Sequence, residues 1–497
     1  MNIKYLGISI GPIIATFSQV RKPRHLWSAS YVFSHLMKII IEEGIKMSGE
    51  LISQAQVKDR YPELGLYPDR VIFEGNLDAE ALTKAVFKNF ATSIGITEEQ
   101  AQGYFNIMIV GIESESESVA IGELHKKLDV LELANRCEDS NARKGVLELI
   151  SSGTKSTLYE LAFESGNFPV NTLAEIAAIE TKFTNEEAWQ NASDFEKLFD
   201  KTFLSAIINE DLFYFLLKKR MQGELKSYHK YFCVVQADGD NMGKVFGNLQ
   251  DGKLQDLSQS LIAFGKAASK LIKDFGGLPI YAGGDDLLFL APVVSKKKRN
   301  IFDLLNYIDY KYQRKVIDKA NELQNPDKKV ETSMSYGISI NYYKHPLYEA
   351  LNNARDLLFV EAKNYKSTKN TIVCNLRKHS GASFKVMLDK KQDDIKKAFE
   401  KLTGIAAEDK MVSATAHKLR ENKVLWQETK GEKKRLEAFF KNFMGLGEKE
   451  SEQNDYLKKV KQILGLLMGN SDKEITQNIY SMLRIAKFIN GEEVKDE

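Results

Sequence analysis

The sequence has few cysteines and prolines and contains no long apolar run. Among its 497 residues are three cysteines and nine prolines. Cys137, Cys233 and Cys374 stand far apart and form no Cys-x-x-Cys pair, which argues against a disulfide framework and against a cysteine zinc site. No run of about 18 apolar residues occurs, so we expect no membrane span. These absences fit a protein of the reducing cytoplasm, which is where we expect this one.

Charge and length limit the possible functions further. The chain carries 70 basic and 68 acidic residues, a net charge of +2. The whole molecule therefore has no strong attraction to nucleic acid, and any basic surface must be local. The N-terminus is apolar but is broken by Gly11-Pro12 and lacks a small-residue cleavage site, so we interpret it as a core strand rather than a signal peptide. A chain of this length is too long for one core, so we expect three or four domains.

The spacing of apolar residues predicts an α+β protein in which one pattern occurs twice. A β-α-β-β-α-β pattern, typical of ferredoxin-like domains, is recognisable near the N-terminus and again, more clearly, in the second half. A mainly helical stretch separates the two, and a charged helical bundle follows them. The predicted boundaries are 1–118 and 228–387 for the ferredoxin-like domains, 119–227 for the helical linker and 388–497 for the C-terminal helices.

The most informative motif is GLPIYAGGDDLLFL at 277–290. Asp285 and Asp286 place two adjacent carboxylates between apolar strands, which is costly unless a cation binds them. Gly283 and Gly284 allow a tight turn and the close approach of a bulky ligand. We interpret the motif as a β-hairpin that presents a divalent metal ion and a nucleoside triphosphate to a reaction.

A second acidic motif, ADGDNMGK, follows the continuous apolar strand predicted at 231–237. In the β-α-β-β-α-β sheet this strand lies beside the hairpin, so Asp238 and Asp285 could share a Mg²⁺ or Mn²⁺, with Asp286 and the Gly239 carbonyl nearby. The alternative is an ordinary turn, because Asp-Gly and Asn are common turn residues.

Basic residues further along offer contacts for phosphates. Lys363, at the end of a helix predicted at 347–363, is the best candidate for a triphosphate contact, and a solvated lysine is the alternative. Lys369 follows in a basic loop with Lys366. Ser335 and Ser339 are weaker candidates for contacts to a base or ribose. The basic stretch 296–299 opens a predicted helical insertion at 296–325 and is more typical of a solvated helix start than of an RNA contact.

These motifs together resemble the large subunit of type III CRISPR effector complexes. The resemblance lies in DGDNMGK, GLPIYAGGDDLLFLAP and SYGISINYYKHPLYEALNNARDLLFVEAK, which are similar to the active palm domain of that family. The N-terminal stretch ISIGPIIATFSQVRKPRHLWSASYVFSHLMK resembles the first palm of the Cmr-type (III-B) branch. The strongest part of the resemblance is about 150 residues long.

The resemblance implies a metal-dependent nucleotidyltransferase that acts on ATP. It implies Asp238, Asp285 and Asp286 as metal-binding and catalytic residues. A 3′-hydroxyl attacks an α-phosphate and pyrophosphate leaves; the product is a cyclic oligoadenylate or, in some members, an ATP–S-adenosylmethionine conjugate. The implied partners are the other Cmr subunits, guide RNA and target RNA. The expected nucleotide-binding residues are Gly239, Asn241, Gly243, Lys244, Gly283, Gly284, Lys363 and Lys369.

Three departures from the family pattern matter. None of the seven histidines is followed by Asp, so we expect no histidine-aspartate nuclease activity. Only Cys137 lies between the two palms, so we expect no zinc. The first palm ends its first strand at Gly11-Pro12 without an acidic turn, so we expect it to be non-catalytic.

Two other functions compete with the enzyme. One is a catalytically silent scaffold that binds nucleotide within the RNA-guided complex; the intact acidic motifs argue against it. The other is a free-standing diguanylate cyclase, which is disfavoured because the turn reads Gly-Gly-Asp-Asp and because the remaining domains would have no role.

Overall fold

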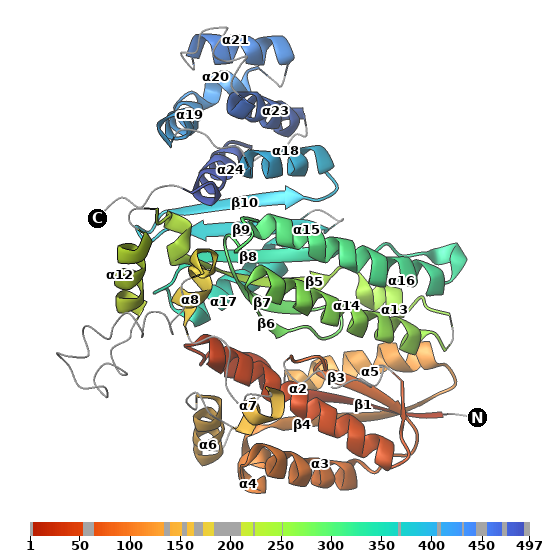
Figure 1. Cartoon of the computed structure of the whole chain (residues 1–497). Coiled ribbons are helices and arrows are strands. Elements are labelled where there is room, and N and C mark those ends of the chain that lie inside the picture. The colour runs from red at the N-terminus through yellow and green to blue at the C-terminus, as the bar shows by residue number, and fades with distance from the viewer. Residues whose placement is uncertain are drawn as a thin grey trace, which may run out of the picture.

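The chain forms two β-sheets with helices packed around them, and further helices follow the second sheet, as a computed structural model shows (Figure 1). The structure describes residues 3–52, 64–133, 140–151, 157–163, 172–182, 210–221, 224–250, 252–365, 369–404, 409–429, 432–443, 455–469 and 475–491. This is the α+β architecture that the sequence predicts. None of the described helices is long and apolar enough to cross a membrane.

The first sheet has four strands in the order β2-β3-β1-β4, and β1 pairs antiparallel with both β3 and β4. Helices α2 and α3 share a core with one face, while α5 packs on β1 and β4 from the other. Residues 53–63, which follow β2, lie outside the described part. The elements are β1 (Ile3–Gly11), α1 (Ile13–Phe17), α2 (Pro23–Lys46), β2 (Glu50–Leu51), β3 (Arg70–Glu74), α3 (Ala79–Ile94), α4 (Glu98–Tyr104), β4 (Asn106–Ser114) and α5 (Glu117–Glu132).

The second sheet has six strands in the order β10-β9-β8-β5-β7-β6. All neighbouring strands are antiparallel except β8 and β9. The sequence predicted only helices from about residue 388 onward. It missed the edge strand β10, which precedes those helices and extends past residue 388. The strands are β5 (Tyr231–Gly239), β6 (Leu278–Tyr281), β7 (Leu287–Pro292), β8 (Met334–Tyr342), β9 (Thr371–Arg377) and β10 (Ser383–Asp389).

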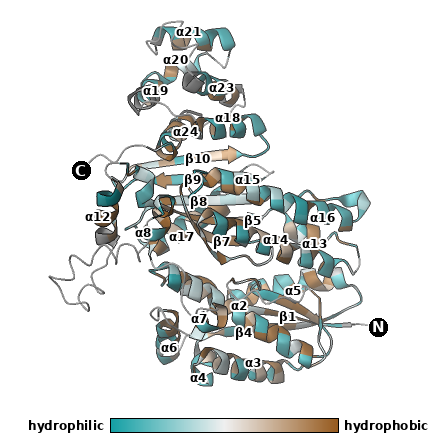
Figure 2. Ribbon diagram, viewed as in Figure 1, coloured by the Kyte–Doolittle hydropathy of each residue, from teal (hydrophilic) through white to brown (hydrophobic). Residues whose placement is uncertain are grey.

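Helices cover both faces of this sheet, which explains why β5 is a continuous apolar run. Cys233 and Val235 share a core with α14 and α15, while Phe232 and Val234 share one with α17. Figure 2 colours the ribbon by hydropathy, and brown, apolar segments occur on strands as well as on helices. The covering elements are α13 (Met242–Phe246), α14 (Leu254–Phe275), α15 (Ile301–Tyr312), the π-helix η3 (Gln313–Ile317), α16 (Asp318–Leu323), η4 (Pro326–Lys328), α17 (Leu347–Asp356) and the π-helix η5 (Leu357–Ala362).

The segment predicted as a basic insertion at 296–325 is part of the core. Phe302, Leu305 and Ile308 of α15 are buried in the cluster that also contains α14. The charge of its first residues hid a helix whose inner face is apolar. Since β7 and β8 lie on either side of β5, this helix is part of the connection that crosses from β7 to β8.

Further helices connect the two sheets and form the C-terminal part. Between β4 and β5 in the chain, after α5, come α6 (Ser140–Ile150), α7 (Thr157–Ala162), α8 (Leu173–Ala177), η1 (Ile179–Thr181), α12 (Glu210–Met221) and η2 (Ser227–Lys230). After β10 come α18 (Asp393–Thr403), α19 (Asp409–Glu421), α20 (Lys423–Gln427), α21 (Lys433–Phe443), α23 (Asp455–Gly469) and α24 (Ile475–Ile489), of which α24 packs on β10. Cys137 lies outside the described residues.

The two sheets meet along the strand that leads to the Gly-Gly-Asp-Asp turn. Gly65, from the loop before β3, forms a bridge with Tyr281, and its carbonyl accepts a hydrogen bond of 3.0 Å from the Ala282 amide. Ser30 of α2 donates a hydrogen bond of 3.0 Å to the carbonyl of Ile280. The first sheet and its helices therefore hold β6 from outside, next to the turn.

Candidate active site

Strand β5 ends beside the tip of the β6–β7 hairpin, as the sequence predicts. The Gly239 amide donates a hydrogen bond of 3.2 Å to the carbonyl of Asp285. A Cβ atom on Gly239 would lie 2.6 Å from Oδ2 of Asp285 and 2.7 Å from the hydroxyl oxygen of Tyr312. Both distances are shorter than van der Waals contact, so only glycine lets the hairpin carboxylate approach β5 this closely.

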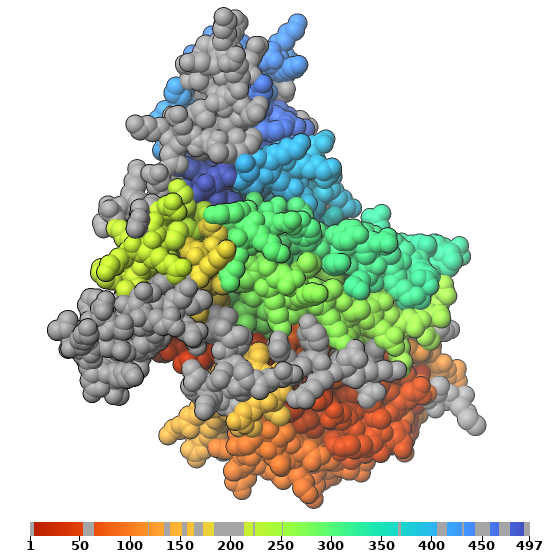
Figure 3. Space-filling view, viewed as in Figure 1, coloured from red at the N-terminus to blue at the C-terminus, as the bar shows by residue number. Residues whose placement is uncertain are grey.

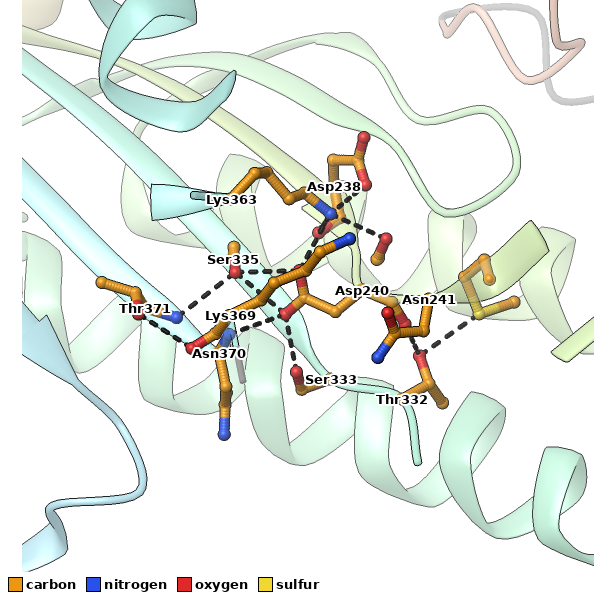
Figure 4. Close-up of polar contacts among 12 residues, drawn as sticks. Asp238, Asp240, Asn241, Thr332, Ser333, Ser335, Lys363, Lys369, Asn370 and Thr371 are labelled. Carbon is orange, nitrogen blue, oxygen red and sulfur yellow. Dashed lines mark hydrogen bonds and ion pairs between the residues drawn. The ribbon is translucent and has the colours of Figure 1, made fainter. Parts of the chain in front are cut away.

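The Lys363 ammonium group is surrounded by oxygen atoms from the end of β5 (Figure 4). It donates hydrogen bonds of 3.0 Å and 2.8 Å to the carbonyls of Asp238 and Gly239. It also contacts the Asp238 carboxylate and lies 2.9 Å from Oδ1 of Asp240. Alternate residues of a strand point to one face, which is why Asp238 and Asp240 reach the same lysine. The alternative of a solvated lysine is wrong, since only 11% of this side chain is exposed.

A π-helix delivers Lys363 to this position. Segment η5 continues α17, and the Lys363 amide donates to the carbonyl of Leu358, five residues earlier, at 2.8 Å. π-Helical turns are rare and occur frequently at functional sites. Here the turn ends a helix that packs on β8, and so places the lysine over the end of β5.

Asp240 is the functional candidate that the sequence reading missed. Its side chain is fully buried and accepts hydrogen bonds from Ser333 (2.6 Å), Ser335 (2.9 and 3.0 Å) and the Asn370 amide (3.0 Å). Burial alone would raise the pKa of Asp240, but Lys363 and the serine hydroxyls outweigh it and hold this pKa below its ordinary value. The sequence did contain a signal for Asp240: it stands two residues after Asp238, and side chains two residues apart in a strand point to the same face of the sheet.

The two serines proposed for base or ribose contacts have structural roles instead. Ser335 is fully buried and directs its hydroxyl to Asp240. Ser339 is also buried, and it accepts a hydrogen bond of 2.8 Å from the Asn341 amide group. Both side chains therefore face neighbours within the protein.

The carboxyl groups of the hairpin turn are held at unusually high pKa values. Burial, and then the charge of Asp238, raise the pKa of Asp285 to about 7. Burial, followed by the charges of Asp285, Asp238 and Asp69, raises the pKa of Asp286 well above its ordinary value. Asp69 belongs to the loop before β3, so the first sheet adds negative charge here. One lysine thus faces more carboxylates than it can neutralise.

This excess negative charge bears on the predicted metal ion. Carboxylate and carbonyl oxygens are the ligands that Mg²⁺ and Mn²⁺ prefer, so the donor set fits such an ion in chemistry and in charge. As the side chains stand, however, the described part of the chain contains no group of three or more His, Cys, Asp or Glu arranged to hold a metal ion. Lys363 provides the positive charge beside Asp238 in this arrangement.

The other predicted binding residues surround this centre at different distances from it. Gly284 has a φ of 63°, which favours glycine, and a Cβ on Gly283 would collide with the Tyr281 ring. Asn241 (φ 61°) donates a hydrogen bond of 3.2 Å to the carbonyl of Glu331. Gly243 and Lys244 lie on the exposed side of α13, and Lys369 lies beside Asp240 in Figure 4. Lys366 is outside the described residues.

Comparison with known proteins identifies the second sheet. Residues 231–373 match the family model of the second palm domain of Cas10/Cmr2. The chain carries a Cas10/Cmr2-type second palm domain. The CRISPR system Cmr subunit Cmr2 of Pyrococcus furiosus is 31% identical over 188 residues, a match that covers 32% of this chain and 20% of that protein. The chain thus spans about a fifth of the length of that curated relative.

Solved structures share the fold beyond the second palm domain. A Csm1–Csm4 cassette in complex with cA4 has a TM-score of 0.51 and 11% sequence identity, covering 98% of this chain and 70% of that chain. The same cassette in complex with AMPPNP has a TM-score of 0.51 and 13% identity, covering 94% and 69%. At these identities the likeness establishes a common fold.

Proposed function

We propose that this protein is the large subunit of a Cmr-type CRISPR effector complex and that its second palm domain is a metal-dependent nucleotidyltransferase that uses ATP. In this proposal both sheets belong to ferredoxin-like palms, 1–118 being non-catalytic and 228–387 catalytic. A zinc-free helical linker (119–227) and C-terminal helices (388–497) complete the chain. The observation that carries the proposal is the gathering of Asp238, Asp285 and Asp286 around one end of the sheet, together with a buried lysine.

The roles of the residues follow from their positions. Asp238, Asp285 and Asp286 would hold Mg²⁺ or Mn²⁺, which when bound supplies Lewis-acid stabilisation of charge on the phosphates and a lower hydroxyl pKa. Asp240 positions Lys363 by charge and by hydrogen bonding. Lys363, already at the end of β5, would pair with the anionic triphosphate once the substrate competes for its ammonium group.

The reaction joins an acceptor to the adenylyl part of ATP, and pyrophosphate leaves. The attacking oxygen and the leaving oxygen must lie in line at the α-phosphate, so positioning accounts for most of the catalysis. Gly284, whose Cβ position has no atom within 4 Å, leaves room for the nucleotide to approach the backbone, whereas Gly239 makes room for the Asp285 carboxylate. Asp285 binds a cation better when its carboxyl group is deprotonated. Activity should therefore rise as pH passes through the raised pKa of this group.

Two acceptors are compatible with this donor site. A second ATP attacking through its 3′-hydroxyl would give oligoadenylates that can cyclise, and S-adenosylmethionine would give a conjugate. Identification of the products by mass spectrometry distinguishes the two acceptors.

The proposed setting is antiviral defence in the cytoplasm, within a complex that contains other Cmr subunits and guide RNA and is activated by target RNA. A silent scaffold that only holds nucleotide is the competing function. The repulsion among Asp238, Asp285 and Asp286 speaks against it, because a purely structural site would gain stability by losing one of these carboxylates.

The experiment uses the chain assembled with its partner subunits, guide RNA and target RNA. ATP is supplied with Mg²⁺ or Mn²⁺, with and without S-adenosylmethionine, and the products are identified by mass spectrometry. We expect ATP conversion that depends on target RNA, and a product that contains methionine identifies the conjugate. Equal ATP consumption without target RNA would contradict the proposed activation.

The matched variants separate catalysis from assembly. Asp285→Ala with Asp286→Ala should abolish conversion while the complex still assembles. Asp327→Asn removes an exposed carboxylate on η4 and should change neither. Unchanged turnover in the double variant would refute the catalytic assignment and leave the scaffold function.

A further inference from the structure

The outer face of α15 carries two exposed tyrosines with a cation on each ring. Tyr307 and Tyr310 are 43% and 59% exposed. The Arg299 guanidinium lies 4.9 Å from the centroid of the Tyr307 ring and donates a hydrogen bond to its hydroxyl. The Lys311 ammonium lies 5.7 Å from the centroid of the Tyr310 ring. The two rings and their cations therefore form one exposed patch on a helix whose other side is buried in the core.

The charge around these tyrosines is mostly positive and unpaired. Among the described residues, Arg299, Lys311 and Lys315 form no ion pair with a carboxylate, and neither do Lys296 and Lys297. Arg314, one helical turn beyond Tyr310, pairs with Asp318 at 3.4 Å but keeps 66% of its side chain exposed. Asp303 is the acidic residue of α15 on this side, and it caps the helix. A polyanion therefore fits this surface better than a neutral or basic protein does.

The spacing of the two tyrosine rings along α15 suits neighbouring bases of a single-stranded nucleic acid. Tyr307 and Tyr310 are three residues apart, which places them about 4.5 Å apart along the helix axis. Each ring has a cation near it, so a base could stack on the face that the cation leaves free while the cations contact phosphates. Duplexes do not offer unstacked bases, so the surface favours an unpaired strand.

The same helix continues into the catalytic centre. Tyr312, two residues after Tyr310, is buried, and its hydroxyl oxygen lies where Gly239 and Asp285 meet. Figure 1 shows α15 across the front of the second sheet, and Figure 3 shows this green part of the chain on the outer surface of the same face. A strand bound on α15 would lie outside the catalytic site but on an element that borders it.

From these observations we infer that the outer face of α15, formed by Arg299, Tyr307, Tyr310, Lys311 and Arg314, binds single-stranded RNA. This inference rests on the proposed function for the choice of RNA as the strand. It adds a defined contact surface on the second palm domain, and it can be tested without any turnover of ATP.

The test measures fluorescence anisotropy of a labelled 12-nucleotide single-stranded RNA titrated with the full chain. Tyr307→Ala with Tyr310→Ala should weaken binding by about fivefold or more for each base that loses its stacking partner. Tyr307→Phe with Tyr310→Phe keeps the rings and should bind like wild type. Tyr348→Ala removes a tyrosine of similar exposure (39%) on α17 and should also leave binding unchanged.

Salt dependence distinguishes the cations from the rings. Arg299→Gln with Lys311→Gln should lower the slope of log K against log salt by about 1.4, since each phosphate contact to a single strand contributes about 0.7. The control Lys84→Gln with Lys88→Gln removes two exposed cations from α3 and should not change the slope.

Three results would overturn the inference. The first is that the Tyr307→Ala, Tyr310→Ala variant binds RNA like wild type, and the second is that the Tyr348→Ala control loses as much affinity for RNA. The third is that polyglutamate displaces the labelled RNA as well as unlabelled RNA does. Tighter binding of single-stranded DNA than of RNA would overturn the choice of RNA. The Asp285→Ala, Asp286→Ala double variant should still bind RNA, so failure of catalysis and failure of this surface give different results.

Discussion

Replacement of Asp240 by Asn tests whether the buried carboxylate holds the site together. Asp240 accepts hydrogen bonds from Ser333, Ser335 and the Asn370 amide, and it lies 2.9 Å from the Lys363 ammonium group. Asn has nearly the same shape but no charge, and its NH₂ group would face one of these donors. The substitution therefore leaves Lys363 with Asp238 as its remaining carboxylate partner and places a donor against a donor.

The expected cost is large because both partners are removed from water. Breaking a buried ion pair by removing one charge costs about 3–5 kcal/mol. For a folded unit of roughly 150–250 residues, each kcal/mol lowers the melting temperature by about 2–4 °C, so the expected decrease is roughly 6–20 °C. ATP conversion should fall as well, because Lys363 loses the group that positions it.

The measurement is thermal unfolding of the full chain followed by circular dichroism, with Asp327→Asn as an exposed control that should stay near wild type. Because the pKa of Asp240 is lowered in the folded protein, its stabilisation exists above the unfolded pKa of about 4 and is lost as pH falls further. The gap between wild type and Asp240→Asn should therefore shrink in acid. A decrease below 2 °C at pH 7, or a gap that widens in acid, would refute the reasoning.

Three further predictions concern the same centre. Gly239→Ala should push the Asp285 carboxylate out of place, since its Cβ would lie 2.6 Å from Oδ2; we expect loss of ATP conversion and a destabilisation of about 1–3 kcal/mol in urea unfolding. Because the pKa of Asp285 is raised to about 7, the free energy of unfolding should decrease as pH rises from about 4 to 7. The affinity for Mn²⁺, measured by calorimetry, should increase over the same pH range. If neither quantity changes with pH, the raised pKa is contradicted. Lys363→Met should leave Asp238 and Asp240 without their cation, lowering the melting temperature and abolishing conversion, whereas a fully active variant would exclude Lys363 from the site.

The acidic motifs were predictable from the sequence because their meaning is local. Two adjacent carboxylates between apolar strands are unusual in any fold, and the strand before Asp238 is apolar along its whole length. The separation of these motifs by one amphipathic helix predicted that β5 and the hairpin would be neighbours. Strand order and pairing in the second sheet confirm this placement.

The contacts of Asp240 and Lys363 could not be predicted from the sequence, because they depend on residues far away in the chain. Asp240 stands in a stretch rich in turn residues, and its burial depends on Ser333, Ser335 and Asn370, which lie about 90 to 130 residues later. The π-helix before Lys363 leaves no signal in the hydrophobic pattern. The charge of 296–299 likewise concealed that the helix after it belongs to the core.

The sequence by itself determined the candidate acidic motifs and the order of the elements that present them, because apolar periodicity and unusual carboxylate pairs are properties of short segments. Only the tertiary structure decided how these charges are balanced. Asp69 comes from the first sheet, Lys363 from the end of a π-helix and Asp240 from the end of β5. The pKa of each carboxyl depends on the burial and the neighbours that folding brings to it from elsewhere in the chain.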